Sequence, residues 1–463
     1  MSDRHICQIA FSAINAAQLR DWYHDCFGMV KCGRIFSVPP MPTDRIQGIR
    51  PNPAETVSWL IDRQDYFQLE FFQFHRPRSR LRPFDWRPCD IGYNLAGFHV
   101  TDFDRVLSRI AGASDRPPPI PIGAPGDRRV ALQDPEGNWI EILERDPIAQ
   151  VEGADPCVVR PEVVTATRFI RLSVPDLEAS VARFAGTMGL SRVEGFELHT
   201  PEHEAMWGLP GAVVKTALLR GVNFLVEIAQ YQDPAPRGWP TGYQISDQGY
   251  MNFAIGYRST DEFDRHFENV RRQGFTPNHH SPVDIGIFRV MYVNDPDGFS
   301  VEMLNARKAL WSLSGFNPGE PYVQNEVLVR ASPGETWNKL INHAGMGEWS
   351  PFKTRVLRPG LEAPDGPGCI RKLSAFGMNI TEEVVDWEEG RRYTYRLRTG
   401  APFRWHQGDV FVSEEYGLTR VRWAIRFESW IPFTGKITAW ILQRILARAL
   451  NNLKPVSYTH LRA

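Results

Sequence analysis

The sequence contains little cysteine: six cysteines are scattered over 463 residues, with no Cys-x-x-Cys pair. This is too few for a disulfide scaffold, so reduced thiols and a cytoplasmic location are expected. Charge of one sign is also missing, because 53 Lys and Arg balance 54 Asp and Glu. The balance argues against nucleic acid or an anionic membrane as a partner. No apolar run approaches the ~18 residues of a membrane-spanning helix.

The sequence has the composition of a folded globular protein. Hydrophobic residues make up 42% and charged residues 23%, close to the average of soluble domains. At roughly 100–200 residues per domain, the length predicts about three domains. Residues 455–463 share no pattern with the segment before them and resemble a translated sequencing adapter, so we treat them as a scar.

The clearest internal signal is a long repeat. The segment Asp134-Pro-Glu-Gly-Asn-Trp-Ile-Glu141 returns as Asp295-Pro-Asp-Gly-Phe-Ser-Val-Glu302, an offset of 161. The pair Gly92-Tyr93 returns as Gly249-Tyr250, an offset of 157. Asp-Pro-x-Gly is typical of a tight hairpin turn, because Pro fixes φ and Gly permits a positive φ.

The repeat defines two copies, 1–147 and 163–306, and two expected linkers, 148–162 and 307–321. Each copy has an inner repeat of an alternating strand, a capped helix and several further strands. In the first copy, an alternating strand is followed by a helix that begins after Asn15.

The third region, 322–454, has a different pattern. It opens with a strand-like run of period two, followed by the capping box Ser332-Pro-Gly-Glu335 with Pro at the first helical position. Several strand-like runs come next. A long amphipathic helix over about 435–453 closes the region, with Ile437 and Ile441 on its apolar face.

The first 306 residues resemble the vicinal oxygen chelate (VOC) superfamily, which includes glyoxalases, bleomycin-resistance proteins and extradiol dioxygenases. The doubled βαβββ pattern and the two hairpins that lead to Glu141 and Glu302 carry this resemblance. Residues 322–454 resemble the SRPBCC family, which includes START-like proteins and polyketide cyclases, through the capping box, Glu348-Trp349-Ser-Pro and the final helix. The resemblances imply an α+β fold: two tandem paired-βαβββ (VOC) domains, then a helix-grip (SRPBCC) domain.

The VOC resemblance implies a divalent metal site in a curved cleft, with ligands from the first and last strand of each module. In the first copy these positions hold Gln8, Glu70 and Glu141, with Asn94 as a weaker fourth ligand. Their oxygen donors favour Mg²⁺ or Mn²⁺ over Zn²⁺ or Ni²⁺. Glu70 and Glu141 are also the candidate catalytic groups, because close buried carboxylates raise each other's pKa. No nucleotide cofactor is expected.

One register in this ligand set is open. Either Asn94 or Leu95 occupies the first-strand position of the second module, and aligning Asn94-Leu-Ala with Asn252-Phe-Ala favours Asn94. In the second copy the corresponding positions hold Phe169, Glu227, Asn252 and Glu302. Extradiol dioxygenases hold Fe(II) with two His and one carboxylate, so that activity is disfavoured here.

Two functions therefore remain open. The carboxylates favour a glyoxalase-type lyase or isomerase, in which a divalent ion polarises vicinal oxygens of a small molecule. The missing histidines favour a metal-free small-molecule binding protein of the bleomycin-resistance type. The SRPBCC resemblance implies an apolar or aromatic ligand. Monomer and homodimer are both compatible with four modules in one chain.

Two histidine features are given less weight. His199-Thr-Pro-Glu-His203 has the i, i+4 spacing of a helical metal pair, but its Pro and the lack of His-Glu-x-x-His order predict a loop without metal. In the third region, His406 beside Trp405 is the acid/base candidate for neutral pH.

Overall fold

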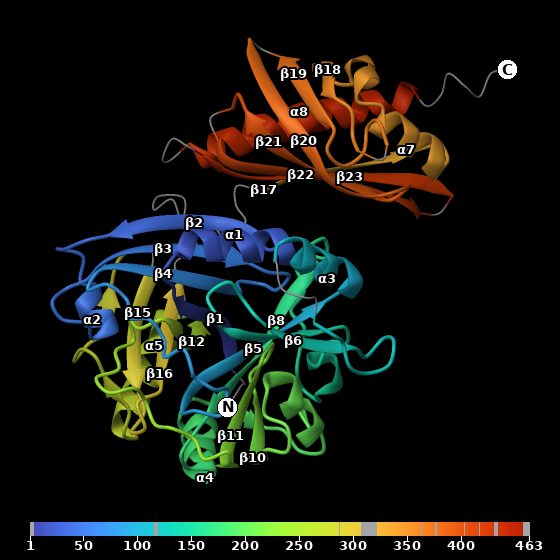
Figure 1. Cartoon of the computed structure of the whole chain (residues 1–463). Helices are drawn as coiled ribbons and strands as arrows, with labels where there is room; N and C mark the ends of the chain where they lie inside the picture. Colours follow the sequence, from blue (N-terminus) through green and yellow to red (C-terminus); the bar gives the residue numbers. More distant parts are fainter. Residues whose placement is uncertain are drawn as a thin grey trace. The chain divides into compact units, whose positions relative to one another are not determined.

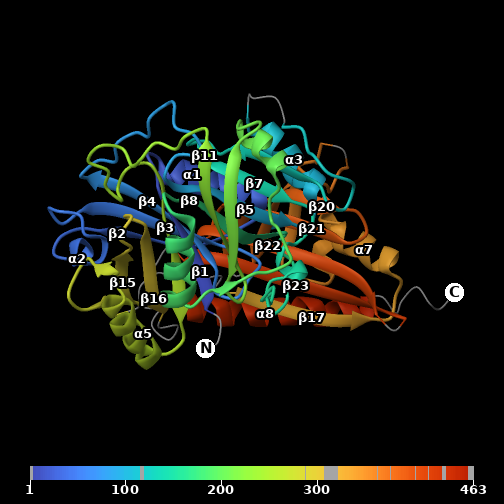
Figure 2. The same ribbon diagram turned by 90° about the horizontal axis from the view of Figure 1, so that it is seen from below.

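The chain forms two compact units, Met1–Trp311 and Ser312–Ala463, drawn from two directions in Figures 1 and 2. The expected linker 307–321 and residues 457–463 of the expected scar lie outside the described residues. The computed structural model describes residues 4–114, 119–286, 288–306, 322–361, 363–375, 377–401, 403–415, 417–429 and 434–456.

The first unit contains four modules, each with strands and at least one helix. The first module comprises β1 (His5–Ser12), α1 (Ala16–Phe27), β2 (Val30–Ser37), α2 (Thr43–Gln47), β3 (Ala54–Ile61) and β4 (Gln68–Arg76). The second comprises β5 (Gly92–Val100), α3 (Phe103–Gly112), β6 (Arg129–Gln133), β7 (Trp139–Leu143) and the short helix η1 (Ile148–Gln150).

The third module comprises β8 (Thr165–Ser173), α4 (Leu177–Val181), η2 (Ala182–Thr187), β9 (Ser191–Arg192), η3 (Pro201–Trp207), β10 (Val213–Arg220) and β11 (Leu225–Asp233). The fourth comprises β12 (Gly249–Tyr257), α5 (Thr260–Arg272), β13 (Thr276–Pro277), β14 (Val283–Asp284), β15 (Phe288–Asn294) and β16 (Ser300–Ala306).

Local sequence signals set the element ends as expected. The Asn15 side chain accepts a hydrogen bond from the backbone N–H of Gln18 and so caps α1, and Gly28 ends this helix in the left-handed conformation. Both Asp-Pro-x-Gly hairpins place their glycine, Gly137 or Gly298, at a positive φ.

The modules pair across the two copies of the repeat. One sheet follows the order β13-β15-β16-β12-β1-β4-β3-β2 and so joins the first module to the fourth. The other follows β6-β7-β5-β8-β11-β10-β9 and joins the second module to the third. Each expected ligand set of one copy is therefore divided between two sheets, because the central strand pairs are β1 with β12 and β5 with β8.

The second unit is one antiparallel sheet with helices. Its strand order is β17-β23-β22-β21-β20-β19-β18, and the α+β class predicted for the chain is confirmed. Its elements are β17 (Tyr322–Val329), α7 (Pro333–Ile341), η5 (Ala344–Glu348), β18 (Lys353–Arg358), β19 (Ile370–Ala375), β20 (Met378–Glu388), β21 (Arg392–Thr399), β22 (Phe403–Glu415), β23 (Leu418–Ser429) and α8 (Gly435–Val456).

Helix α8 is apolar on the expected face but buried over only part of its length. Leu446 and Leu453 are buried in the core of the second unit. Ile437 and Ile441, expected on the same buried face, are 65% and 45% exposed. The amphipathic pattern therefore extends beyond the part of the helix that the core covers.

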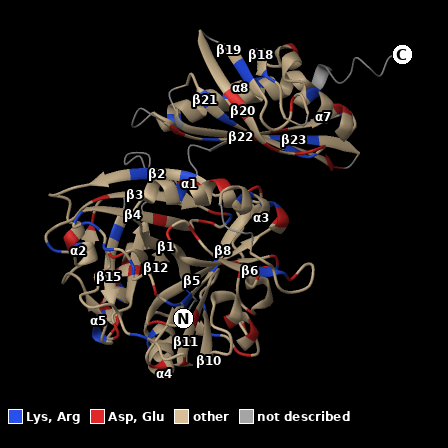
Figure 3. Ribbon diagram, viewed as in Figure 1, with Lys and Arg blue, Asp and Glu red and all other residues tan. Residues whose placement is uncertain are grey.

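Acidic and basic residues are interspersed on both units, as Figure 3 shows, in agreement with the balanced composition. Among the described helices, none combines the length and apolar character needed to cross a bilayer.

Candidate metal centre and substrate pocket

Four polar side chains occupy related positions on the sheet of the first and fourth modules. Ala10 on β1 pairs with both Asn252 on β12 and Glu70 on β4. Ala254 on β12 pairs with both Gln8 and Glu302 on β16. An approximate twofold relation therefore matches Gln8 with Asn252 and Glu70 with Glu302.

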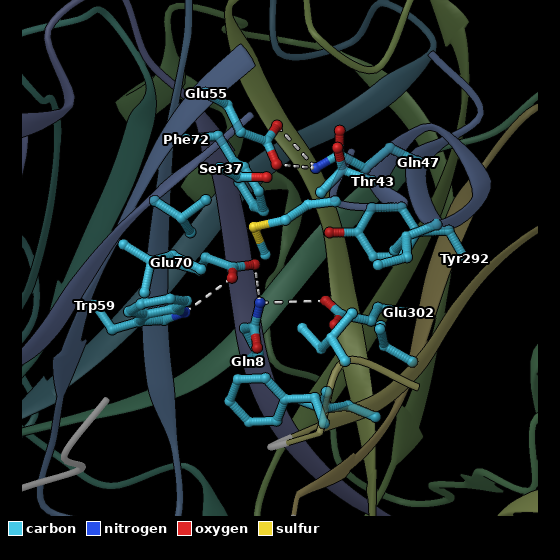
Figure 4. Close-up of a pocket in the computed structure, with 18 of the residues that line it drawn as sticks. Gln8, Ser37, Thr43, Gln47, Glu55, Trp59, Glu70, Phe72, Tyr292 and Glu302 are labelled. Carbon is cyan, nitrogen blue, oxygen red and sulfur yellow. Dashed lines mark hydrogen bonds between the residues drawn. The ribbon is translucent and has the colours of Figure 1, made fainter. Parts of the chain in front are cut away.

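Gln8 lies between the two glutamates, as Figure 4 shows. Its Nε2 donates to Glu70 Oε2 in a short hydrogen bond and to Glu302 Oε2 at 3.2 Å. Trp59 Nε1 donates to Glu70 Oε1 at 2.8 Å, and Gln68 Nε2 donates to Gln8 Oε1 at 2.5 Å. The structure therefore brings the predicted Gln8 and Glu70 together, with Glu302 from the second copy as the third group.

These groups line a pocket of about 530 Å³. A third acid, Glu55, also lines it and accepts from Gln47 Nε2 at 3.0 Å. None of the described lining residues is Lys, Arg or His. Most of the remaining wall is apolar and comes from both modules: Ile35, Met41, Ile46, Val57, Phe72, Ile285, Phe288, Val290 and Leu304.

The pocket makes negative charge costly. Burial, and then the negative charge of Glu302, raise the pKa of Glu70 well above its usual value. Burial also raises the pKa of Glu302 to about 8 and that of Glu55 to about 8. Without a basic partner, such carboxyls hold protons at neutral pH or ionise next to a bound cation.

The fourth related position supports a cation site. Asn252 is fully buried, and its amide interacts with the hydroxyl of Tyr292, which lines the pocket. Asn252 lies on the same sheet as the two glutamates, and its amide oxygen is a donor of the kind that Mg²⁺ accepts.

The other sheet has a different set at its related positions. Glu141 and Glu227 are both retained, but the two first-strand positions hold Leu95 and Phe169. His199 lies between the glutamates: Nε2 is 3.0 Å from Glu141 Oε2, and Nδ1 is 2.6 Å from Glu227 Oε2. The predicted ligand Glu141 therefore does not join Gln8 and Glu70.

In the second sheet, His199 lies between the two glutamates, where the first sheet would hold a metal ion. Burial lowers its pKa, but Glu227 and Glu141 raise it, and the net shift is upward. Burial raises the pKa of Glu227, yet Arg171 and His199 lower it to about 2. Arg129 also pairs with Glu141 at 3.2 Å. The expectation that His199 binds no metal agrees with this ion pairing, but its bridging role had no sequence signal beyond the His itself.

Asn94 is not in a ligand position. Leu95 pairs with Trp139 and Arg171 and occupies the first-strand position, so the expected register was wrong by one residue. Asn94 Nδ2 instead donates to the carbonyl oxygens of Pro88 and Asp90, at 2.6 Å each. The offset of 157 between Gly92 and Gly249 makes Leu95 the equivalent of Asn252 in the sequence repeat. This offset gives the correct register.

The second unit has its own group of metal-ligand types. His343, Asp365 and Cys369 have ligand atoms within 4.8 Å of one another. Arg371 Nη1 donates to His343 Nδ1 at 2.8 Å, which places a cation beside the group and disfavours a second one. Burial lowers the pKa of His406 to about 4, so this residue is neutral near pH 7.

Comparisons with known proteins match these two units separately. Residues 321–457 match the family described as polyketide cyclase / dehydrase and lipid transport, which confirms the C-terminal resemblance. Glyoxalase I from Zea mays is similar over 65% of this chain and 92% of its own, with 16% identity and a TM-score of 0.44. A START superfamily protein from Mycobacterium smegmatis is similar over 29% of this chain and 96% of its own, with 15% identity and a TM-score of 0.27. The comparison with curated proteins gave no match.

Proposed function

We propose that the first unit is a divalent-metal-dependent lyase or isomerase that acts on adjacent oxygens of a small, largely apolar molecule. The cation is held by Gln8, Glu70 and Glu302, with Asn252 as a fourth ligand. The supporting observation is the convergence of Gln8, Glu70 and Glu302 at an apolar pocket whose described lining has no basic residue. Carboxylate and amide oxygens favour Mg²⁺ or Mn²⁺.

The Gln8 amide must turn before the site can bind a cation. Its NH₂ group now faces both carboxylates, where it acts as a weak positive partner. A half-turn about the last side-chain bond presents Oε1 in the same volume, because the two ends of an amide are nearly equal in size. Gln68 must turn with it, so that its Oε1 accepts from Gln8 Nε2 in place of the present bond from Gln68 Nε2 to Gln8 Oε1. Deprotonation of Glu70 and Glu302 then completes an oxygen site.

The chemistry divides between the cation and the chain. A bound divalent ion supplies Lewis-acid polarisation of two adjacent substrate oxygens. Glu55 lies in the same pocket but outside the ligand set, and its pKa of about 8 lets it carry a proton near neutral pH. We assign Glu55 to proton transfer at the substrate carbon or oxygen, a role for which a pKa near the working pH is suited.

The second unit complements this site with an apolar-ligand function. Its family match includes lipid transport, and its core has many aromatic side chains between the sheet and α7 and α8. We infer that it binds an apolar or aromatic small molecule.

A metal-free binding protein is the alternative function. One observation favours it: Gln8 and Trp59 already donate hydrogen bonds to Glu70, and Gln8 also donates to Glu302. Both carboxyls therefore have hydrogen-bond partners without an ion. An extradiol dioxygenase is disfavoured, because none of the described lining residues of the pocket is a histidine.

Metal content and turnover of the wild type and two variants test the proposal. The purified wild-type chain, loaded with Mn²⁺ or Mg²⁺ and passed through a desalting column, is expected to retain about one ion per chain at this single site. Glu302→Gln is expected to lose the ion. Glu55→Gln, in the same pocket, is expected to retain the ion but to lose turnover by roughly 10²–10⁴-fold on 2-oxo or vicinal-diol substrates.

The outcomes separate the two functions. Equal metal content in the wild type and Glu302→Gln contradicts the proposed ligand set. A wild type that neither retains an ion nor shows a thermal shift with added Mg²⁺ or Mn²⁺ supports the metal-free alternative. Ligand binding would then be measured directly with apolar compounds.

A further inference from the structure

A second pocket lies between the loops that join modules, residues 77–91 and 234–248. Three ion pairs cross between these loops: one joins Arg237 Nη1 to Asp85 Oδ2 at 2.6 Å, and the other two are related by the repeat. Arg80 Nη2 lies 2.5 Å from Asp247 Oδ2, and Arg237 Nη2 lies 2.6 Å from Asp90 Oδ2. At the offset of 157, Arg80 corresponds to Arg237 and Asp90 corresponds to Asp247. These two ion pairs therefore join the loops symmetrically, and we call them the clamp.

The pocket beside these ion pairs is open to solvent, has a volume of about 820 Å³ and has aromatic walls. Trp239 stacks on Tyr243 with ring centroids 4.4 Å apart, and both line the pocket with Trp86. Tyr93 and Tyr250 also line it, and each donates its hydroxyl to a backbone carbonyl of another module. None of the described residues lines both this pocket and the pocket beside Gln8.

The symmetry of the clamp is broken at one position. Arg82 corresponds to Trp239 at the same offset of 157. Trp239 Nε1 donates to the carbonyl of Asp297 at 2.9 Å, and Arg82 donates to Gly137 O at 3.3 Å and to Asn138 Oδ1. Each side chain is therefore held on one of the two Asp-Pro-x-Gly hairpins, but one is a cation and the other an aromatic ring.

One polar group of this pocket lacks a hydrogen-bond partner among the described residues, and a second carries a charge without a direct ion pair. Arg82 has no carboxylate within ion-pair distance among the described residues, and its guanidinium lies 4.6 Å from the centre of the Trp86 ring. Asn94 is 1% exposed, and its Oδ1 accepts no hydrogen bond from any described residue. Within the described part of the chain, Arg82 donates only to neutral acceptors, and the charges of Asp134 and Glu136 reach it from beyond ion-pair distance. The buried Asn94 acceptor without a donor costs free energy, which a complementary ligand recovers.

We propose that this pocket binds a flat aromatic carboxylate that also carries a hydrogen-bond donor. The carboxylate pairs with Arg82, whose planar fork matches two carboxylate oxygens. The ring packs against the faces of Trp86 and Trp239. The donor pairs with Asn94 Oδ1. This site is separate from the proposed metal centre and does not depend on it.

Calorimetric titration of the full chain tests the proposal with benzoate, 3- and 4-hydroxybenzoate, and phenol. We expect one of the hydroxybenzoates to bind more tightly than benzoate, because only the former can donate to Asn94, and phenol to bind weakest. Arg82→Gln is expected to weaken carboxylate binding roughly 10–100-fold, the loss expected for one charged hydrogen-bonding partner. Trp239→Leu is expected to weaken all four ligands together.

Three comparisons keep the test decisive. Glu302→Gln, in the other pocket, must leave hydroxybenzoate affinity unchanged. Arg82→Lys retains the charge without the fork and is expected to bind with intermediate affinity, so it answers the question if Arg82→Gln does not fold. Equal carboxylate affinity in the wild type and a folded Arg82 variant, or no binding of any carboxylate at millimolar concentration, overturns the proposal.

Discussion

Two pairs of buried glutamates occupy equivalent positions in the two sheets of the first unit, and the residue between them decides what each pair can do. Burial raises the pKa values of Glu70 and Glu302, and the neutral amide of Gln8 between them brings no positive charge to offset it. An imidazole, His199, separates Glu141 from Glu227, and the two carboxylates raise its pKa against the effect of burial. The first arrangement can exchange its protons for a metal ion, whereas the second already contains its cation.

Replacing His199 tests the internal cation. His199→Gln leaves Glu141 and Glu227 buried without the charge between them, and we expect a loss of ~3–5 kcal/mol in the free energy of unfolding. Because the pKa of His199 is raised above 6.5, its stabilisation is complete below that pH and is lost as pH rises through the folded-state pKa. Urea denaturation between acid and alkaline pH measures both effects.

The control for this experiment is His280→Gln, because His280 is exposed. The control should show the stability and pH dependence of the wild type. If His199→Gln matched it in both, the imidazole would not be a structural cation.

The pH dependence of the glutamate pair in the other sheet has a separate signature. The pKa of Glu302 is raised from 4.5 to about 8, so its protonated form stabilises the fold below about pH 4.5, and this contribution is lost as pH rises through about 8. In chelator, Glu302→Gln is therefore expected to unfold on the order of 2–4 °C above the wild type at alkaline pH, the shift for about 1 kcal/mol.

Thermal melts with and without Mn²⁺ separate this effect from that of His199. Added Mn²⁺ should raise the unfolding temperature of the wild type at alkaline pH and leave Glu302→Gln unchanged. A variant that melts below the wild type in chelator at alkaline pH would show that ionising Glu302 is not costly.

At the scale of the elements, local sequence signals predicted where helices begin, but they did not predict the register of the strands. The cap at Asn15 and the box at Ser332 predicted where α1 and α7 begin, because capping uses side chains three residues apart in sequence. The choice between Asn94 and Leu95 failed, because a strand alternates faces and one residue reverses the assignment. Only the position of Gly92 in the repeat carried the correct register.

A tight contact between central strands gives a prediction at this scale. A Cβ on Gly97 of β5 would lie 1.7 Å from Cε1 of Phe169 on β8, and Phe169 is fully buried. We expect Gly97→Ala to lower the free energy of unfolding by ~1–3 kcal/mol through overpacking. Denaturant titration measures the loss, and adding Phe169→Leu should recover part of it.

The matched control is Gly112→Ala at the end of α3, where an added Cβ meets nothing within 4 Å. Alanine favours a helix over glycine, so this variant should be as stable as the wild type or slightly more stable. Equal stability of Gly97→Ala and Gly112→Ala would show that β5 and β8 are not packed as closely as described.

At the scale of the whole first unit, the repeat and the sheets divide the chain differently. The sequence repeat divides the unit into residues 1–147 and 163–306, because each copy has the same motifs in the same order. The sheets instead join the first module to the fourth and the second to the third. Local patterns cannot distinguish these pairings, since both bury the same strand faces. Because the first module shares a sheet with the fourth, Glu302 and not Glu141 completes the site beside Gln8.

Separating the copies tests this pairing. In a fragment of residues 1–147, β1 lacks β12 and β5 lacks β8, so two central strands have unpaired edges and exposed apolar faces. We expect this fragment to aggregate or to form mixed oligomers, whereas residues 1–311 should unfold cooperatively as a monomeric unit. Size-exclusion chromatography with circular dichroism distinguishes them, and co-expression of 1–147 with 148–311 should restore a one-to-one complex. A folded, monomeric 1–147 would contradict the cross-copy pairing and would return Glu141 to the neighbourhood of Gln8 and Glu70.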